Sequence, residues 1–319
     1  MASTDTPEKL LQSLSSATLH NLDGLVAVVT GGSTGIGLMI TTTLLANGAR
    51  VYIIGLDQKQ VDGVVAIYDK AVGGRLVGLA GDVSKKEEAK RLAAEVGRRE
   101  SYVNVLFNNA GVVIANLKKN ANASVDDYVN AFDTYSESDF HSVSAVNTFA
   151  MYFMSIAFLK LLDASKGMRK KFPPQIVITS SINAWSKMRL TCVAPLYDPD
   201  TAGRGIPYLL SKSAAAHLTK VLAHEFLPLQ IRVNGIAPGY VFSYTTGDLK
   251  ADVNALGFPD ISREQCAQEI KALFDVPFGK SGGHTDMGKL ALMLVTNEFI
   301  NGEIVLIDGG TLLLYPAGY

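Results

Sequence analysis

Short runs of apolar and β-branched residues alternate along the chain with longer segments whose apolar residues recur at helical spacing. Five or six residues make up each run, which is typical of strands buried on both faces of a sheet. The predicted strands cover residues 25–30, 50–55, 75–79, 103–107, 175–179, 231–236 and 303–307. Because helices or polar loops separate them, this pattern predicts a parallel sheet with helices on both faces.

The segments between the strands predict helices of different character. The segment at 85–100 is charged and amphipathic, whereas the one at 138–162 is long, mostly apolar and contains Asn147. The other predicted helices cover residues 36–47, 58–72 and 208–227. The polar residues 1–22 form an N-terminal extension that we expect to lie across the surface or to be partly mobile. Residues 23–319 then account for one doubly wound α/β domain.

The turn after the first predicted strand is rich in glycine, with the sequence GGSTGIG at residues 31–37. Glycine permits positive φ angles, and the lack of a Cβ lets backbone N–H groups approach a pyrophosphate closely. The N-terminus of the following helix adds a partial positive charge. The turn therefore predicts a phosphate cradle, although glycine turns between a strand and a helix are also common for structural reasons.

Composition and charge narrow the possible partners. The chain has 319 residues, 48% of them hydrophobic, and a net charge of −1, so it has no general attraction for nucleic acid or anionic membranes. Cys192 and Cys266 are the two cysteines, which together with the absence of a histidine cluster argues against a disulfide framework or a metal site. The longest apolar run, residues 148–159, is too short to span a bilayer. No secretory signal precedes it, so we expect a cytoplasmic protein that binds a small molecule.

Further motifs follow the glycine turn in a characteristic order. They are DV at 82–83, NNAG at 108–111, Asn147, SS at 180–181, YLLSK at 208–212, PG at 238–239 and DGG at 308–310. Between residues 24 and 310 this order resembles the short-chain dehydrogenase/reductase family, and the whole sequence resembles fungal 3-oxoacyl and secondary-metabolite reductases. The resemblance implies a single-domain Rossmann-type fold that binds NAD(H) or NADP(H).

The resemblance also implies the cofactor contacts. The glycine-rich loop would bind the pyrophosphate, Asp82 the adenine, and the backbone after Pro238-Gly239 the nicotinamide carboxamide. The implied cofactor-binding residues are Gly31, Ser33, Thr34, Gly35, Ile36, Gly37, Asp57, Asp82, Val83, Asn109, Ala110, Gly111, Tyr208, Lys212, Pro238, Gly239, Val241 and Ser243.

The implied catalytic residues are Asn147, Ser181, Tyr208 and Lys212. Reduction of a carbonyl needs a proton donor near its oxygen, and Tyr208 carries a phenol whose reference pKa is about 10. Lys212 lies one helical turn further on the same face, where its charge favours the phenolate. Ser181 can stabilise negative charge on the oxygen, although Ser180 is an alternative. By resemblance, Asn147 would hold a water that links Lys212 to solvent.

Two features bear on the choice between NAD(H) and NADP(H). NADP-preferring members of the family commonly have Arg or Lys before the second glycine of the loop or after the second strand, where this chain has Thr34, Leu56 and Asp57. Asp57 could accept hydrogen bonds from the ribose and repel a 2′-phosphate, which favours NAD(H). The nearby Lys59 opposes this interpretation, and Asp57 could instead be only a helix cap.

Two stretches extend the family pattern on the substrate side. Ser181 and Tyr208 lie 27 positions apart, about twice the separation usual in the family, so we interpret residues 182–207 as an inserted substrate loop. The alternative is a surface insertion that does not contact the substrate. Residues 247–283 occupy the position of a substrate lid. Aromatic and aliphatic side chains in and near the lid indicate an apolar or aromatic substrate, although core packing explains them equally well: Phe242, Tyr244, Phe258, Leu273, Phe274 and Phe278.

The sequence thus predicts an oxidoreductase that interconverts a secondary alcohol and a ketone. The alternative is a cofactor-binding regulator or a non-redox cyclase or isomerase on the same scaffold, and the intact catalytic set argues against it. A homodimer or homotetramer is expected through helices 138–162 and 208–227. The first of these carries more apolar residues than one sheet-facing stripe needs, namely Phe149, Met151, Tyr152, Phe153, Ile156 and Phe158.

Overall fold

The computed structural model describes residues 6–113, 124–130, 135–168, 172–187, 205–241, 276–315 and 317–318. Within these ranges seven strands form one sheet in the order β3-β2-β1-β4-β5-β6-β7, and every pairing is parallel. The strands are β1 Val26–Thr30, β2 Arg50–Gly55, β3 Leu76–Ala80, β4 Val105–Asn108, β5 Gln175–Thr179, β6 Arg232–Pro238 and β7 Ile304–Ile307. This arrangement confirms the predicted doubly wound fold.

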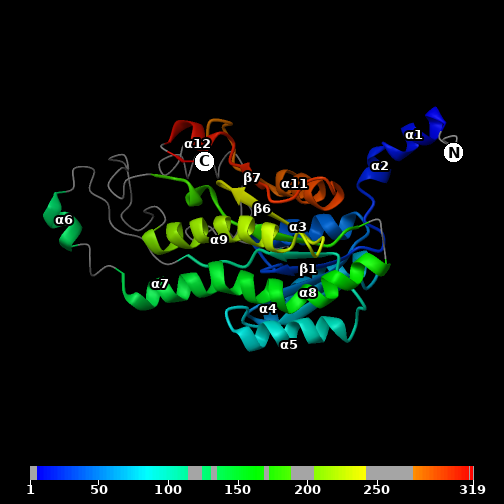
Figure 1. Ribbon diagram of the computed structural model, residues 1–319, viewed down its shortest axis with the longest axis horizontal. Helices are drawn as coiled ribbons and strands as arrows, with labels where there is room; N and C mark the ends of the chain where they lie inside the picture. Colours follow the sequence, from blue (N-terminus) through cyan, green and yellow to red (C-terminus); the bar gives the residue numbers. More distant parts are fainter. Residues whose placement is uncertain are drawn as a thin grey trace.

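Helices cover both faces of the sheet (Figure 1). Alternate strand residues such as Ala27 and Val29 face one cluster of buried residues, formed with α3 (Gly35–Ala46), α4 (Gln58–Val72) and α11 (His284–Thr296). Their neighbours Val26 and Val28 face a second cluster, formed with α5 (Lys86–Gly97), α8 (Ala150–Met168) and α9 (Ile206–Glu225). Both faces of the strands are therefore buried, as their continuous apolar sequences predict.

The predicted helix 138–162 is not a single α-helix. It consists of α7 (Glu137–Ser144), the π-helical turn η2 (Ala145–Phe149) and α8. In η2 the N–H of Ala150 donates to the carbonyl of Ala145, five residues earlier, rather than four. The side chains of Asn147 and Thr148 in this turn hydrogen-bond to Ser211 on α9, so contacts with another element accompany the departure from α-helical geometry.

The apolar run at residues 148–159 is part of a much longer continuous helix, Glu137–Gly167, so the length of the run alone does not describe this segment. At 31 residues it is long and apolar enough to cross a membrane by length and composition, although the run 148–159 is not. However, Met154, Phe158 and Leu162 are fully buried in the cluster shared with α5 and the sheet. One face of the helix therefore packs in the core, while 39% of its most apolar 18-residue stretch is buried.

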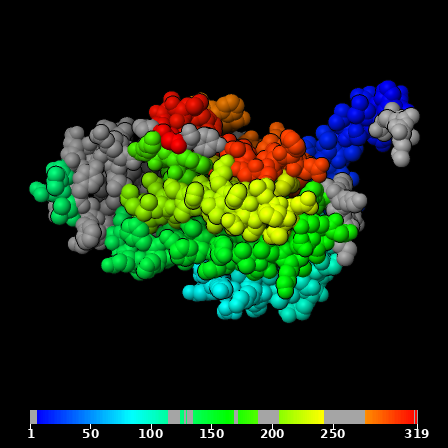
Figure 2. Space-filling model, viewed as in Figure 1, coloured from blue at the N-terminus to red at the C-terminus, as the bar shows by residue number. Residues whose placement is uncertain are grey.

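The N-terminal extension forms two short helices, α1 (Pro7–Ser13) and α2 (Ser16–Leu19), which project from the body of the molecule (Figures 1 and 2). Every side chain of residues 6–19 is exposed, so this part does not lie across the surface. The packed core begins at Leu22, which is fully buried and whose N–H donates to the carbonyl of Asn47 at 2.8 Å.

Three further short helices complete the described part of the chain: α6 (Val125–Asn130), the 3₁₀ turn η3 (Ile182–Ala184) and α12 (Thr311–Leu314). After α12 the chain returns to the segment that follows β5. Ala317 forms an isolated antiparallel bridge with Ser186, and the N–H of Gly318 donates to the carbonyl of Trp185 at 3.0 Å. The C-terminal tail therefore contacts the start of the predicted substrate loop.

Candidate active site

The glycine turn has the geometry that a phosphate cradle requires. Gly31 has a φ of +64°, and a Cβ on Gly37 would lie 2.0 Å from the carbonyl oxygen of Gly31. The turn can therefore close only without these side chains. Helix α3 begins directly at Gly35, and its N-cap residue Thr34 makes no side-chain capping bond. First-turn N–H groups have no partner within a helix, so this end of α3 suits an anion such as pyrophosphate.

Hydrogen bonds hold the exits of three strands together beside this turn. Thr30 Oγ1 accepts from the backbone N–H groups of Asn109 and Ala110 at 2.9 and 3.0 Å. Asn109 Nδ2 donates to the carbonyl of Thr30 at 3.1 Å, and its Oδ1 accepts from Thr179 Oγ1 at 3.2 Å. These bonds connect β1, β4 and β5, so the NNAG segment holds the exits of these strands together beside the glycine turn.

A cavity of about 150 Å³ opens at the C-terminal ends of β1, β4, β5 and β6. In a doubly wound sheet ligands bind at this edge, where the strand order reverses. Twelve of the predicted site residues line the cavity: Gly31, Thr34, Ile36, Asn109, Ala110, Gly111, Ser181, Tyr208, Lys212, Pro238, Gly239 and Val241.

Seven predicted residues lie outside the lining of this cavity, and Ser243 lies outside the described residues. Gly37 packs against the turn, and Val83 is buried in the hydrophobic core. The others are Ser33, Gly35, Asp57, Asp82 and Asn147. Five residues line the cavity without having been predicted from the sequence: Val113, Thr179, Ile182, Asn183 and Tyr240. Their positions next to predicted motifs are the only sequence signal that could have found them.

Tyr208 and Lys212 lie in the first two turns of α9 and are almost completely buried, at 9% and 3% exposure. Lys212 Nζ lies 5.7 Å from the centroid of the Tyr208 ring and donates to the carbonyl of Thr179 at 2.9 Å. The pair is thus a buried constellation held by β5, not an exposed pair on a helix. The ammonium lies where it can stabilise negative charge on the phenol.

The two serines after β5 have different surroundings. Ser180 Oγ donates to the carbonyl of Lys212 at 2.9 Å and so connects β5 to α9. Ser181 Oγ accepts from the backbone N–H of Asn183 at 3.2 Å, and within the described part of the chain no bond uses its own proton. The hydroxyl of Ser181 can therefore donate to a ligand in the cavity, whereas that of Ser180 is already used.

Asn147 is fully buried, and its amide makes three hydrogen bonds. Its Oδ1 accepts from the N–H of Val112 at 2.8 Å, and its Nδ2 donates to the carbonyl of Val112 at 2.9 Å and to Ser211 Oγ at 3.0 Å. A Cβ on Gly111 would lie 3.2 Å from Asn147 Oδ1 and 3.4 Å from Lys212 Nζ. Asn147 therefore anchors the chain after the NNAG segment close to the Lys212 ammonium.

Two predicted cofactor contacts lie at the exits of β2 and β3. Asp57 caps α4, because its Oδ1 accepts from the N–H of Gln60 at 2.8 Å. Asp82 Oδ1 accepts from the N–H and the hydroxyl of Ser84 at 3.0 and 2.6 Å. Each carboxylate has a second oxygen with which it can accept a hydrogen bond from a ligand.

The first residues of the predicted substrate loop are firmly attached to the body. Trp185 packs against a small cluster of buried residues between α9 and the last two strands, and Ser213 Oγ donates to the carbonyl of Ala184 at 2.8 Å. Phe278 is 72% exposed and does not line the cavity. The rest of the aromatic and aliphatic set proposed for the lid lies outside the described residues: Phe242, Tyr244, Phe258, Leu273 and Phe274.

Comparison with known proteins agrees with this architecture. A family model described as short chain dehydrogenase matches residues 25–254. Short-chain dehydrogenase/reductase PhomF of Diaporthe leptostromiformis is 34% identical over the full length of both chains. The rhamnolipids biosynthesis 3-oxoacyl-[acyl-carrier-protein] reductase of Pseudomonas aeruginosa is 29% identical, over 91% of this chain and 97% of its own. An active-site complex of RhlG with NADP from Pseudomonas aeruginosa is 27% identical, with a TM-score of 0.71 over 92% of this chain and 98% of that chain.

The fold, the site and these relatives define the class of the protein. The chain belongs to the short-chain dehydrogenase/reductase family. It is an oxidoreductase of the kind that uses NAD(H) or NADP(H) to act on alcohol and carbonyl groups. The resemblance drawn from the ordered motifs is confirmed.

Proposed function

We propose that the chain interconverts a ketone and a secondary alcohol, with Tyr208 as the acid and base. The observation that carries this proposal is that Tyr208, Lys212 and Ser181 line the same cavity as the glycine turn. The residues fit a dinucleotide, because Gly31 and Gly37 leave a cradle that side chains would fill. When bound there, NADH or NADPH supplies the hydride that is transferred to the carbonyl carbon.

Three side chains have complementary roles in this mechanism. In the direction of reduction the Tyr208 hydroxyl gives its proton to the carbonyl oxygen, and Ser181 Oγ donates a hydrogen bond to the same oxygen. Lys212, held by the carbonyl of Thr179 at 2.9 Å, stabilises the phenolate that remains. Alcohol oxidation uses the same groups in reverse, with the phenolate accepting the proton.

Asn147 has a positioning role in this proposal. Its amide bonds to Val112 and Ser211 hold η2 and α9 together beside Lys212. We propose that a water near this junction connects Lys212 to solvent and restores the proton of Tyr208. The Asn147 amide is hydrogen-bonded to Val112 and Ser211, so Asn147 positions the elements around the proposed water and does not itself transfer the proton.

We further propose that NAD(H) is preferred. Asp57 follows β2, and the carboxylate oxygen that does not cap α4 can accept hydrogen bonds from the ribose diol. Its negative charge would repel a 2′-phosphate. Among the described residues at this strand exit, no arginine takes part in a hydrogen bond or ion pair with Asp57 that would offset that repulsion.

Asp57→Ser tests this preference while keeping the helix cap, because serine is also a good N-cap residue. We expect wild-type protein to bind NADH more tightly than NADPH in a fluorescence titration. The variant should bind NADH about tenfold more weakly, the loss of one hydrogen bond to a charged group, with an unchanged melting temperature. Tighter binding of NADPH by wild-type protein would contradict the assignment of Asp57.

The reaction itself is tested by ketone-dependent oxidation of NADH and NADPH. A panel of aliphatic, aromatic and 3-oxoacyl thioester ketones also tests the predicted apolar character of the substrate. We expect at least one of these ketones to be reduced to its secondary alcohol in proportion to the cofactor consumed. Cofactor binding with no turnover on any ketone or alcohol would favour a regulatory protein instead.

A further inference from the structure

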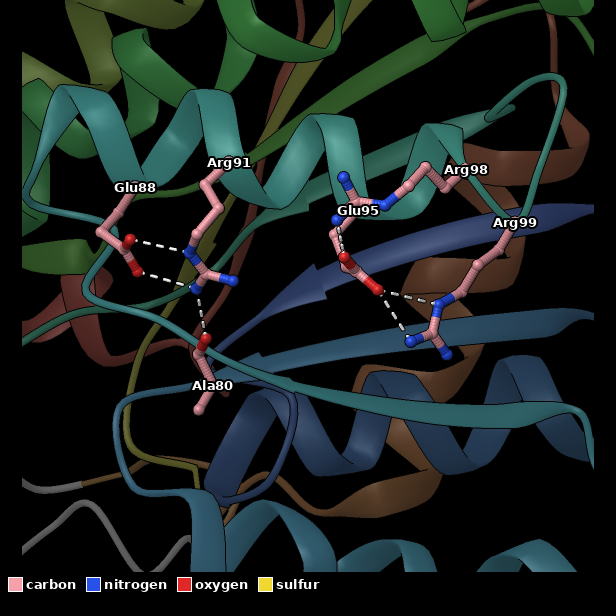
Figure 3. A network of polar contacts seen from close by, with 6 residues as sticks. All are labelled: Ala80, Glu88, Arg91, Glu95, Arg98 and Arg99. Atoms are coloured by element: carbon pink, nitrogen blue, oxygen red, sulfur yellow. Dashed lines mark hydrogen bonds and ion pairs between the residues drawn. The ribbon is translucent and has the colours of Figure 1, made fainter.

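Helix α5 carries an ion pair that contacts the exit of β3 (Figure 3). Arg91 binds Glu88 with both ends of its guanidinium, since Nε donates to Oε1 and Nη2 to Oε2, each at 2.8 Å. Arg91 Nη2 also donates to the backbone carbonyl of Ala80, the last residue of β3, at 2.7 Å. An exposed ion pair alone contributes little to stability, so the bond to the strand end is the informative feature.

The carbonyl of Ala80 needs this partner because β3 is an edge strand. The N–H of Gly81 donates to the carbonyl of Gly55 on β2 at 2.9 Å. In a trans peptide the C=O and N–H point in opposite directions, so the Ala80 carbonyl points away from the sheet. Within the described residues no strand follows on that side, and Arg91 supplies the donor that a further strand would have provided.

Glu88 contacts the same turn two residues further on, at the backbone N–H of Asp82. The pKa of Glu88 is lowered, mainly by its hydrogen bond with Arg91 and also by the charge of Arg91 and the backbone N–H of Asp82. A Cβ on Gly81 would lie 3.0 Å from Arg91 Nη2 and 3.1 Å from Glu88 Oε2, so the pair packs directly on this turn. The next residue is Asp82, whose Oδ1 is fixed by Ser84.

We propose that Glu88 and Arg91 are positioning residues for the adenine end of the dinucleotide. They hold the turn of residues 80–82 from the solvent side, while Gly55 holds it from the sheet side, so that the free oxygen of Asp82 faces the adenosine. The inference rests on the proposed function, in which Asp82 contacts adenine. In this proposal α5 also contributes to cofactor affinity, although neither Glu88 nor Arg91 lines the cavity.

The C-terminal end of α5, opposite the end that carries Glu88 and Arg91, offers a matched control. Glu95 forms ion pairs with Arg98 and Arg99, including contacts from Arg99 Nε and Nη2 at 3.2 and 2.8 Å (Figure 3). In the part of the chain that the structure describes, no bond connects this group to the exit of β3. Arg91→Met and Arg99→Met remove the same charge and one ion pair each. Methionine retains the aliphatic stem and the helix propensity of arginine.

The experiment measures the dissociation constants of three probes by calorimetry: NADH, ADP-ribose and reduced nicotinamide mononucleotide. We expect Arg91→Met to weaken the binding of NADH and ADP-ribose by about fivefold, which corresponds to the loss of one hydrogen bond. The affinity for the mononucleotide should stay unchanged. Arg99→Met should bind all three as wild-type protein does. In an Asp82→Ala background, Arg91→Met should have no further effect.

Several results would overturn the inference. Wild-type affinities in Arg91→Met would show that the pair does not act on the cofactor, and equal weakening of all three probes would show a general structural effect. Similar losses in Arg99→Met would assign the effect to net charge. If wild-type protein bound neither NADH nor NADPH, the proposed function would fail and the positioning role with it.

Discussion

Ser180 and Ser181 show how a single hydrogen bond separates two neighbours of the same type. Ser180 bonds to the carbonyl of Lys212, while Ser181 keeps its proton for the cavity. The sequence placed both at a strand end but could not distinguish them, because the partner of Ser180 is a backbone carbonyl on another element. Every residue has a backbone carbonyl, so the sequence does not show which carbonyl will accept such a hydrogen bond.

Alanine substitutions should separate the two roles. Ser181→Ala should lower kcat by about 10²- to 10³-fold, the usual effect of removing an oxyanion donor, with little change in cofactor affinity. Ser180→Ala should retain most of kcat but lower the melting temperature, because the Lys212 carbonyl loses a buried partner. Steady-state kinetics and thermal unfolding of both variants check this, and a reversed pattern would exchange the assignments.

Ser181, Tyr208 and Lys212 line one cavity, and their common position was predictable because they follow an ordered motif, whereas the groups that support them were not. Their catalytic roles stay a proposal. The bond from Lys212 to the carbonyl of Thr179 depends on how α9 packs against β5, and the cavity position of Asn183 depends on the turn that follows β5. Asp57 illustrates a residue with two compatible roles. The structure shows the cap, and the ribose contact stays a prediction.

At the scale of elements, a buried polar network at the N-terminal ends of β5 and β6 anchors α11 and the chain that leads to β7. Asn234 Nδ2 donates to Gln175 Oε1 at 2.9 Å and to the carbonyl of Ile300 at 2.8 Å, and its Oδ1 accepts from the N–H of Glu303 at 3.0 Å. Gln175 Nε2 in turn donates to the carbonyl of Leu294 at 3.0 Å on α11. These polar residues align elements at the end of the sheet opposite the cavity.

Asn234→Ala should therefore lower the free energy of unfolding by about 2–4 kcal/mol, because it leaves several buried polar groups without partners. Cofactor affinity should change little, since the site is at the other end of β6. Urea unfolding measures the effect, and the exposed Asn301, which accepts from the N–H of Val233 at 2.9 Å, provides the milder control Asn301→Ala. An equal decrease in the free energy of unfolding in both variants would show that burial of Asn234 does not cause the larger effect.

The apolar pattern predicted strand positions to within two residues, and β2 and β5 fully, because strands buried on both faces have a continuous apolar sequence. It did not predict the π turn at Ala145–Phe149, since the 3.6-residue period continues across it. The bonds of Asn147 and Thr148 to α9 accompany that turn, and they depend on tertiary contacts.

At the scale of the whole molecule, the long helix and α9 present apolar side chains to solvent. Phe149, Tyr152 and Ile156 lie on one face at helical spacing and are 51%, 46% and 41% exposed, and Leu210 on α9 is 57% exposed. Figure 2 shows these helices side by side across the visible face. Such a surface is typical of a site where protein chains associate, and we propose that a second copy of this chain covers it.

Ile156→Glu should weaken this association by placing a charge in the proposed interface. We expect wild-type protein to sediment as a dimer or tetramer at micromolar concentration and the variant to shift toward monomer, with the fold retained by circular dichroism. Ile67→Glu, at a 43% exposed isoleucine of α4 on the other face of the sheet, provides a control for the same added negative charge. A monomeric wild-type protein would contradict the proposal.

The central claim is that the hydroxyl of Tyr208 transfers the proton at the site that binds the cofactor. The most direct test compares Tyr208→Phe with wild-type protein, in both NAD(P)H binding and ketone reduction. We expect cofactor affinity within about twofold of wild type and a kcat lowered by about 10²- to 10⁴-fold. Full turnover by Tyr208→Phe would contradict the account.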